Sequence, residues 1–415
     1  MKRRHFLGLA AVAGLAGVAG VYWPRRGLFN PCLAQLPKAL ADSALVRAAW
    51  DGIDAHQVWD CHVHLVGIGD SGNDVWSNPK LDSWWHPLQY AQKLFYLNAG
   101  CVHEAPGRVD QSYIERLHNL VDGLRPGAKL MLLAFDLMYR EDGQADRENS
   151  SFYTSNAYAR AMAQQYPRYF EWVASIHPYR ADAVTALEQA AQTGARAVKW
   201  LPNAMNIDPA AARCDDFYRA MAKHDLPLLT HAGKERAVSG SVAQDNGNPL
   251  KLRRALDLGV RVIVAHCASL GEDKDLDQGP NGATVSSFDL FARMMQEPRY
   301  QGRLFGDISA MTQFDRAPFL KQVLARPEWH ARLLNGTDYP LPGILPIYSA
   351  SSFVDLGLLA PDAVPVLDAI QKHNPLLFDF VLKRSLLLNG ERLPARIFET
   401  RPFFERSPHA NTFQQ

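Results

Sequence analysis

The stretch V-W-D-C-H-V-H at residues 58–64 predicts a short β-strand around which the rest of the chain can be interpreted. It starts with apolar, β-favouring residues and is followed by Gly67 and Gly69. Because strand side chains alternate between two faces, Asp60, His62 and His64 lie on the same face. Two imidazoles on one face can bind one metal ion. A buried strand with two hydrogen-bonded histidines would have the same sequence, so the remaining chain must distinguish the two interpretations.

Seven further apolar runs predict strands, and helical patterns separate most of them. The runs cover residues 129–135, 171–176, 195–200, 226–230, 260–265, 303–308 and 332–334. Apolar residues at three- and four-residue spacing predict helices at 158–165, 182–192, 215–224, 249–258, 287–296 and 319–325. Eight strand–helix units predict an α/β fold of the (β/α)8 TIM-barrel class. A doubly wound open sheet is the alternative, but no Gly-rich phosphate loop follows an early strand.

Two segments lie outside this regular pattern. Residues 66–127 form a long insertion after the first strand, rich in Trp, Tyr, Asn and Gly at its start and with helices predicted at 87–97 and 112–124. Residues 361–415 form a C-terminal extension with helices predicted at 362–372 and 375–388. We expect residues 35–415 to be a single domain.

The first 34 residues predict an export signal. Arg3 and Arg4 precede an apolar run that ends at Trp23, and no acidic residue interrupts this segment. The pattern resembles a bacterial twin-arginine signal, which implies the twin-arginine export machinery as a partner. Cleavage near Ala34 would release the protein into the periplasm. An uncleaved signal would tether the protein to the membrane, and a plain anchor or Sec signal is the alternative.

Charge and cysteine content exclude two other classes. The formal net charge is +1, and the body is mildly acidic once the basic N-terminal segment is set aside, so nucleic acid is not an expected partner. The five cysteines are odd in number, widely spaced and lack a C-x-x-C pair. This spacing argues against a disulfide framework, even in an exported protein.

Residue types that bind metals occur where the predicted strands end. In a barrel, the carboxyl ends of the strands converge on one mouth. The residues at these ends are His62, His64, Lys199, His231, His266 and Asp338. Neutral imidazoles and carboxylates suit zinc, manganese or iron(II), so these residues predict a metal site that acts on a small molecule. His177 closes another strand and is a candidate for contact with substrate.

Five motifs resemble the amidohydrolase superfamily of metal-dependent TIM-barrel hydrolases. They are D-C-H-V-H at 60–64, A-V-K-W-L-P at 197–202, L-L-T-H-A-G at 228–233, I-V-A-H-C at 263–267 and N-G-T-D-Y-P at 335–340. The chain looks most similar to the amidohydrolase-related branch, which includes lactonases and the aminocarboxymuconate-semialdehyde decarboxylase. This resemblance implies one divalent metal, usually zinc, with four ligands: His62, His64, His231 and Asp338. It implies that His266 acts as the acid/base or polarises the substrate, and Asp338 beside the metal could also move a proton.

Lys199 decides between one metal and two. In binuclear relatives a lysine at this strand is carboxylated and bridges two metals, and His266 would then be a ligand. The neighbouring W-L-P at 200–202 is more similar to the mononuclear branch, where Lys199 would bind an anionic group of the substrate. An ordinary lysine with a buried stem is the third interpretation.

We therefore expect a metal-dependent hydrolase that uses a metal-activated water on a small ester, lactone or amide. A metal-dependent decarboxylase of a small acid is the alternative on the same scaffold. A non-catalytic binding protein of the cell envelope is a third hypothesis. The intact set of metal-type residues argues against it.

Overall fold

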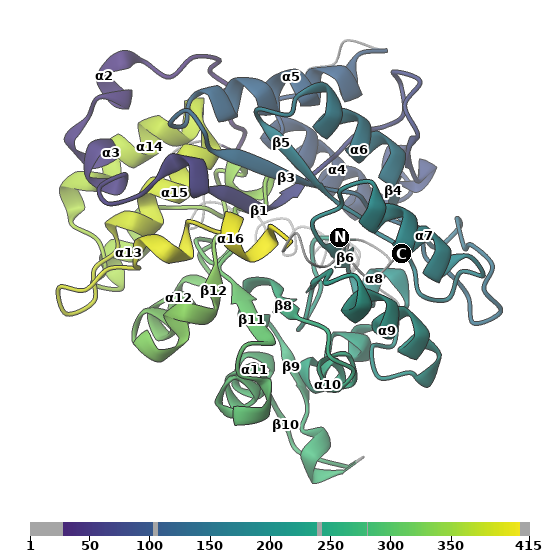
Figure 1. Ribbon diagram of the computed structural model, residues 1–415. Helices are drawn as coiled ribbons and strands as arrows, with labels where there is room; N and C mark the ends of the chain where they lie inside the picture. The colour runs from purple at the N-terminus through teal and green to yellow at the C-terminus, as the bar shows by residue number, and fades with distance from the viewer. Residues whose placement is uncertain (1–27, 103–106, 239–242, 280, 407–415) are drawn as a thin grey trace, which may run out of the picture.

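The computed structural model describes residues 28–102, 107–238, 243–279 and 281–406, and its centre contains all eight predicted strands (Figure 1). They are β1 (Trp59–His64), β3 (Lys129–Leu133), β5 (Phe170–Val173), β6 (Val198–Trp200), β7 (Leu228–Thr230), β8 (Val262–Val264), β11 (Leu304–Asp307) and β12 (Leu333–Leu334). Most are shorter than predicted, because the ladder pairs cover only part of each apolar run.

These strands form two parallel sheets. One has the order β1-β3-β5, and the other has the order β12-β11-β8-β7-β6. The two sheets meet at both edges through single parallel bridges, Ala174 with Val198 and Val63 with Tyr339. The order of strands around the centre is thus the one predicted. The predicted closed barrel is not formed, because no continuous ladder joins the two sheets where their edges meet. Of the strands at these edges, β6 has three residues and β12 only two, which leaves little backbone for a ladder.

Helices surround the strands, as the amphipathic patterns predict (Figure 1). They are α2 (Lys38–Ala41), α3 (Ala44–Ala49), α4 (Pro87–Ala99), α5 (Val109–Asp122), α6 (Asn156–Gln165), α7 (Ala183–Gln192), α8 (Pro202–Met205), α9 (Asp215–Lys223), α10 (Arg253–Asp257), α11 (Ser287–Gln296), α12 (Ala317–Leu324), α13 (Ser351–Asp355), α14 (Val364–His373), α15 (Pro375–Ser385) and α16 (Arg401–Phe404). The helix predicted at 249–258 begins as a short 3-10 turn, Pro249–Leu252, before α10. Proline at its first position and the Asn248 cap favour this tighter start.

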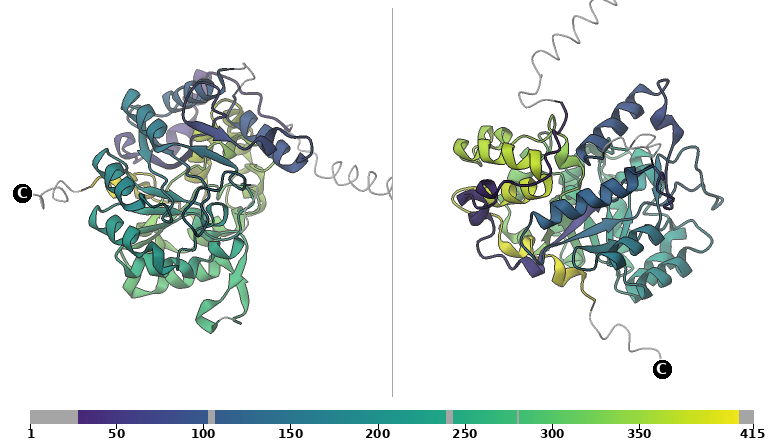
Figure 2. Two further views of the ribbon diagram at one scale, coloured as in Figure 1. Left: turned by 90° about the vertical axis from the view of Figure 1, so that its right-hand side faces the viewer. Right: turned by 90° about the horizontal axis from the view of Figure 1, so that it is seen from above.

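The segment after β1 contains two helices with different environments. α5 packs its apolar face, including Tyr113, Leu117 and Leu120, into the main core. α4 buries only Ala99 and lies at the periphery of the molecule (Figure 2). Two antiparallel pairs were not predicted: β2 (Val75–Ser77) with β4 (Phe152–Thr154), and β9 (Glu272–Lys274) with β10 (Thr284–Ser286).

One helix of the C-terminal extension, α15, belongs to the buried core of the protein. α15 has buried residues from Pro375 to Arg384, and it packs against α3, α5 and α14. A helix that is apolar nearly all round is expected to be enclosed in this way.

The described chain joins the folded body before the predicted boundary at residue 34. Asn30 is buried, and its side chain donates hydrogen bonds to the carbonyl groups of Gly343 and Gln371. Cys32 forms a disulfide with Cys101, a single cross-link that the argument against a disulfide framework did not anticipate, while Cys61, Cys214 and Cys267 are free. A separation of 69 residues gives no local signal for this pairing, so spacing alone could not reveal it.

The predicted export signal lies almost entirely in residues 1–27, outside the described residues. Within the described ranges, no helix is both long and apolar enough to cross a membrane.

Candidate metal centre

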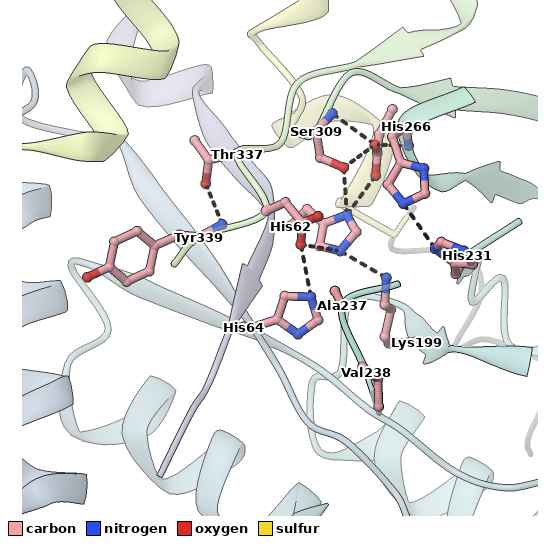
Figure 3. A network of polar contacts seen from close by, with 12 residues as sticks. His62, His64, Lys199, His231, Ala237, Val238, His266, Ser309, Thr337 and Tyr339 are labelled. Atoms are coloured by element: carbon pink, nitrogen blue, oxygen red, sulfur yellow. Dashed lines mark hydrogen bonds and ion pairs between the residues drawn. The ribbon is translucent and has the colours of Figure 1, made fainter. Parts of the chain in front are cut away.

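Three of the predicted ligands lie together at the end of β1 (Figure 3). Asp338 Oδ1 is 3.4 Å from His62 Nε2 and 3.0 Å from His64 Nε2. The three donor atoms, one from each residue, all lie within 4.8 Å of one another. His62 is buried, while the His64 side chain is 24% exposed and faces the adjoining cavity. Two imidazole nitrogens and one carboxylate oxygen are a donor set that fits a divalent metal ion.

The orientation of His62 is fixed by Asp307. The Nδ1 atom of His62 is 2.9 Å from Asp307 Oδ2 and 3.0 Å from Ser309 Oγ. Burial alone would raise the pKa of Asp307, but His62 and Ser309 hold this pKa below its ordinary value. The ionised carboxylate only accepts hydrogen bonds, so the His62 proton is on Nδ1 and the Nε2 lone pair faces Asp338 and His64. A carboxylate behind a histidine is a common support for a metal ligand.

The loop that carries Asp338 is held against β1. A side chain at Gly336 would place its Cβ 2.6 Å from the Cβ of His62, so only glycine allows this approach. Asp60 accepts hydrogen bonds from the Thr337 backbone N–H at 2.9 Å and from the Thr337 hydroxyl at 2.6 Å. Asp60 therefore fixes the backbone of this loop and does not contact an imidazole nitrogen.

Asp338 is ionised at neutral pH. Burial would raise the pKa of its carboxyl group, yet His62, His64 and Lys199 together hold that pKa well below the ordinary value. Lys199 is buried, and its Nζ is 2.9 Å from His62 Nε2. Burial lowers the pKa of Lys199, which brings its uncharged form closer to neutral pH.

His231 and His266 form a second pair next to this group. His231 Nδ1 is 3.0 Å from His266 Nε2, and Arg316 Nη1 is 3.0 Å from His266 Nδ1. A guanidinium group can only donate, so His266 accepts at Nδ1 and carries its proton on Nε2 when neutral. Burial, together with Arg316, holds the pKa of both imidazoles well below the ordinary value. The other nitrogen of His231, Nε2, is buried without a hydrogen-bond partner in the described residues.

His266 is presented by an unusual left-handed turn. His266, Cys267 and Ala268 have φ angles of 41°, 52° and 52°. Each such residue costs free energy for an L-amino acid, so neighbouring contacts must compensate. The His266 backbone N–H donates to Asp307 Oδ1 at 2.6 Å. Asp307 thus contacts the His62 ring with one oxygen and the His266 backbone with the other.

A cavity of about 370 Å³ adjoins these residues. His62, His64, Lys199, His231, His266 and Asp338 all line it. Its apolar walls come from several elements and include Phe95, Leu97, Phe135, Phe152, Leu201 and Ile344. A small, largely apolar molecule with one polar reacting group would match such a cavity.

His177 is not brought to this cavity. Its Nε2 is 2.8 Å from the Met205 carbonyl oxygen, and its Nδ1 accepts the Tyr179 backbone N–H at 3.1 Å. Both ring nitrogens are therefore used by the backbone, and His177 is absent from the cavity lining. The strand-end position therefore did not predict contact with the cavity, because backbone groups of Met205 and Tyr179 take both ring nitrogens.

The sequence did not single out Arg316 or Glu235. Arg316 is buried and lines the cavity, and no described carboxylate lies within ion-pair distance of it. Glu235 is buried, lies 3.4 Å from His231 Nδ1, and accepts the backbone N–H groups of Ala237 and Val238. Both residues belong to loops without a periodic pattern. Asp307, in contrast, stands within the run predicted as a strand at 303–308 and closes β11 in the structure.

This fold and this donor set define a metal-dependent α/β enzyme. Residues 59–376 match the family model described as amidohydrolase, and the chain belongs to this family. The match spans most of the chain and all the residues of the proposed centre.

Solved structures with a similar fold are distant in sequence. An uncharacterised TIM-barrel protein from Bordetella bronchiseptica is 17% identical with a TM-score of 0.43, covering 76% of this chain and 94% of that one. A putative 2-pyrone-4,6-dicarboxylic acid hydrolase from Pseudomonas putida is 16% identical with a TM-score of 0.40, covering 78% and 97%. A 5-carboxyvanillate decarboxylase from Novosphingobium aromaticivorans, solved with manganese, is 13% identical with a TM-score of 0.44, covering 84% and 99%. No curated protein matches the sequence.

Proposed function

We propose that this protein is a metal-dependent hydrolase that adds water to a small ester, lactone or amide. The observation that carries the proposal is the orientation of His62. Asp307 accepts a hydrogen bond from His62 Nδ1, so the lone pair on His62 Nε2 points toward His64 Nε2 and Asp338 Oδ1 at the cavity wall. Family membership supports a metal-dependent reaction of this type without specifying a substrate.

We propose zinc as the metal and His231 as the fourth ligand. His231 lines the same cavity, and its Nδ1 now faces His266 Nε2. A single metal is favoured over two because the Arg316 guanidinium lies 3.0 Å from His266 Nδ1. A second dication held by His266 would be close to this buried positive charge, and their repulsion would be weakly screened.

A divalent metal bound there would supply a water of lowered pKa and a Lewis acid for the carbonyl oxygen of the substrate. Asp338 is ionised and adjacent, so its carboxylate accepts the proton of the attacking water and delivers it to the leaving group. His266 holds a proton on Nε2, which now faces His231 Nδ1; once His231 turned to a metal, this N–H would be free to stabilise the oxygen that gains negative charge. Lys199, beside His62, binds an anionic group of the substrate.

The first test is elemental analysis of the purified chain together with the His231→Ala and His266→Ala variants. We expect about one metal per chain in the wild type and in His266→Ala, and loss of metal in His231→Ala. Two metals per chain that fall to one without His266 would instead indicate a carboxylated Lys199 bridge. Hydrolysis of esters, lactones or amides should disappear after chelation and return with zinc. Undiminished hydrolysis in the metal-free protein would contradict the proposal.

A decarboxylase on the same site is the second candidate. Arg316 and Lys199 both line the cavity, and two cationic side chains there would accommodate the carboxylate that a decarboxylase removes. Mass spectrometry of the product separates the two reactions. A hydrolase product gains the mass of water, whereas a decarboxylase product loses carbon dioxide.

A further inference from the structure

Four large apolar side chains are exposed at the edge of the molecule formed by α4. Phe29 is 52% exposed, Trp84 79%, Trp85 92% and Leu88 77%. We refer to these four residues as the α4 patch. The ring of Phe29 stacks on Phe95 of α4, and Leu88 lies two helical turns before Phe95 on the same helix face. Tryptophan is seldom this exposed in a protein without a binding partner, so the patch needs an occupant.

The rest of the chain does not cover this patch. Gln92 donates to the Arg236 carbonyl oxygen at 3.2 Å, and the Tyr96 hydroxyl donates to the Ala237 carbonyl oxygen. These contacts fix α4 against the loop that follows β7. Gln92, Phe95 and Tyr96 also line the cavity, whereas Trp84, Trp85 and Leu88, at the start of α4 and just before it, do not line it and are largely exposed.

The sequence before Phe29 indicates what the patch meets. Residues 6–23 are an apolar run of 18 residues without a charged side chain. As a helix, such a run would be about 27 Å long, close to the thickness of a hydrocarbon core. Asn30 is buried and Cys32 is cross-linked to Cys101, so the folded body begins immediately after the patch residue Phe29.

The linker between the apolar run and the patch is short. Six residue steps separate Trp23 from Phe29, and an extended chain covers at most about 3.5 Å per residue. Phe29 therefore lies within about 20 Å of the end of the apolar run. If that run is inserted in a bilayer, Phe29 lies near the same membrane surface, and so does the part of α4 on which its ring stacks.

We propose that the uncleaved N-terminal run anchors the protein in a membrane and that the α4 patch binds the lipid surface beside it. Tryptophan side chains are favoured at the lipid–water interface, because one end of the indole is apolar and the other is polar. The exposed start of α4 then rests on lipid, while Gln92, Phe95 and Tyr96 further along the helix line the cavity. This proposal concerns the surface of the molecule and is independent of the reaction proposed above.

Tryptophan fluorescence of the full chain in vesicles tests the proposal. The vesicles contain phosphatidylethanolamine and phosphatidylglycerol with brominated acyl chains, which quench only tryptophans at the membrane. The matched variant Trp84→Phe/Trp85→Phe removes the two reporters and keeps the patch apolar. We expect brominated lipid to quench the wild type more than this variant. The difference belongs to Trp84 and Trp85, because the contribution of Trp23 is common to both proteins.

Aqueous iodide distinguishes the other occupants. Emission from Trp84 and Trp85, obtained as the difference between wild type and variant, should be insensitive to iodide. Quenching by iodide instead of brominated lipid would mean that the patch faces water and would overturn the proposal. Protection from both quenchers would mean that a protein surface, such as a second copy of this chain, covers the patch, and would also overturn it.

Two controls complete the test. Leu276 is 41% exposed near the β9–β10 hairpin, far from α4 in Figure 1, so a Leu276→Trp reporter should respond to iodide alone. The variant Trp85→Glu/Leu88→Glu should detach the patch and raise iodide quenching of Trp84 several-fold. Mass spectrometry of the protein isolated from bacterial membranes should find residues 1–29 retained. A chain that starts after Phe29 would contradict the proposal.

Discussion

Asp307, which the five sequence motifs do not include, contacts two residues of the proposed centre. One of its carboxylate oxygens accepts from the His62 ring, and the other accepts from the His266 backbone and from the Ser309 hydroxyl. His62, the proposed metal ligand, and His266, which is proposed to stabilise the developing charge, are therefore positioned by the same carboxylate. A carboxylate in this role raises the basicity of the histidine and fixes its tautomer.

The variant Asp307→Asn should weaken metal binding by about 10- to 100-fold while the protein still folds. The amide keeps the shape of the carboxylate but loses its negative charge, so His62 becomes a poorer ligand. Competition with a chromophoric chelator measures the change. Asp216→Asn is the matched control, because the Asp216 side chain is 86% exposed on α9. Unchanged metal affinity in Asp307→Asn would mean that the carboxylate serves His266 alone.

His177 contributes to the pH dependence of stability. Burial lowers its pKa from an ordinary value of 6.5 to about 3. The unfolded chain binds a proton that the folded chain excludes in this window, so stability present above pH 6.5 is lost as the pH falls toward 3. Between pH 6.5 and about pH 5 this loss should be about 2 kcal/mol.

Urea unfolding of His177→Gln against wild type tests this effect. The glutamine retains one donor and one acceptor but does not titrate, so its free energy of unfolding should vary less with pH across the same window. Parallel pH profiles for the two proteins would show that His177 is not responsible for the acid sensitivity.

Which site residues the sequence could predict depends on where their signals lie. His62, His64 and Asp338 stand in short motifs at strand ends, and the structure brings them together. Arg316 follows no pattern, because its contact with His266 joins two loops that only the tertiary structure makes neighbours. His177 shows the converse error, since a strand-end position says nothing of whether the following turn leaves the ring free.

At the scale of elements, apolar periodicity predicted the strands and most of the helices. It could not predict where ladders end, because His266 and Asp338 are placed by backbone angles of positive φ beyond the strands. Nor could it predict the burial of α15, because that helix carries Asp379 and Lys383, which neutralise each other in an apolar setting.

Lys383 links α15 to the loop that carries Asp338. Its Nζ pairs with Asp379 and donates to the Gly336 carbonyl oxygen at 2.8 Å, and both charged side chains are fully buried. Lys383→Met should destabilise the protein by about 3–5 kcal/mol, because Asp379 is left buried without its counter-ion. The double variant Lys383→Met/Asp379→Asn should be less destabilised than the single variant. Chemical denaturation measures both, and a double variant that is the less stable of the two would contradict this account.

At the scale of the whole molecule, the Cys32–Cys101 disulfide ties the start of the folded chain to the end of α4. The cross-link closes a loop of 69 residues and restricts the unfolded chain accordingly. Cys32→Ser/Cys101→Ser should lower the free energy of unfolding by about 2–4 kcal/mol. Denaturation of the wild type with and without a thiol reductant provides the comparison, and equal midpoints in both conditions would mean that the cross-link does not form.

The proposed centre is divided between the two parallel sheets, and this division couples the chemistry to the assembly of the fold. His62 and His64 belong to the three-stranded sheet. Strands of the five-stranded sheet, or the turns directly after them, carry Lys199, His231, His266 and Asp307. Neither half alone contains a complete set of ligands. Metal capture would therefore report the docking of the two halves during folding, and a chain cut between β5 and β6 would regain its metal only after its fragments had recombined.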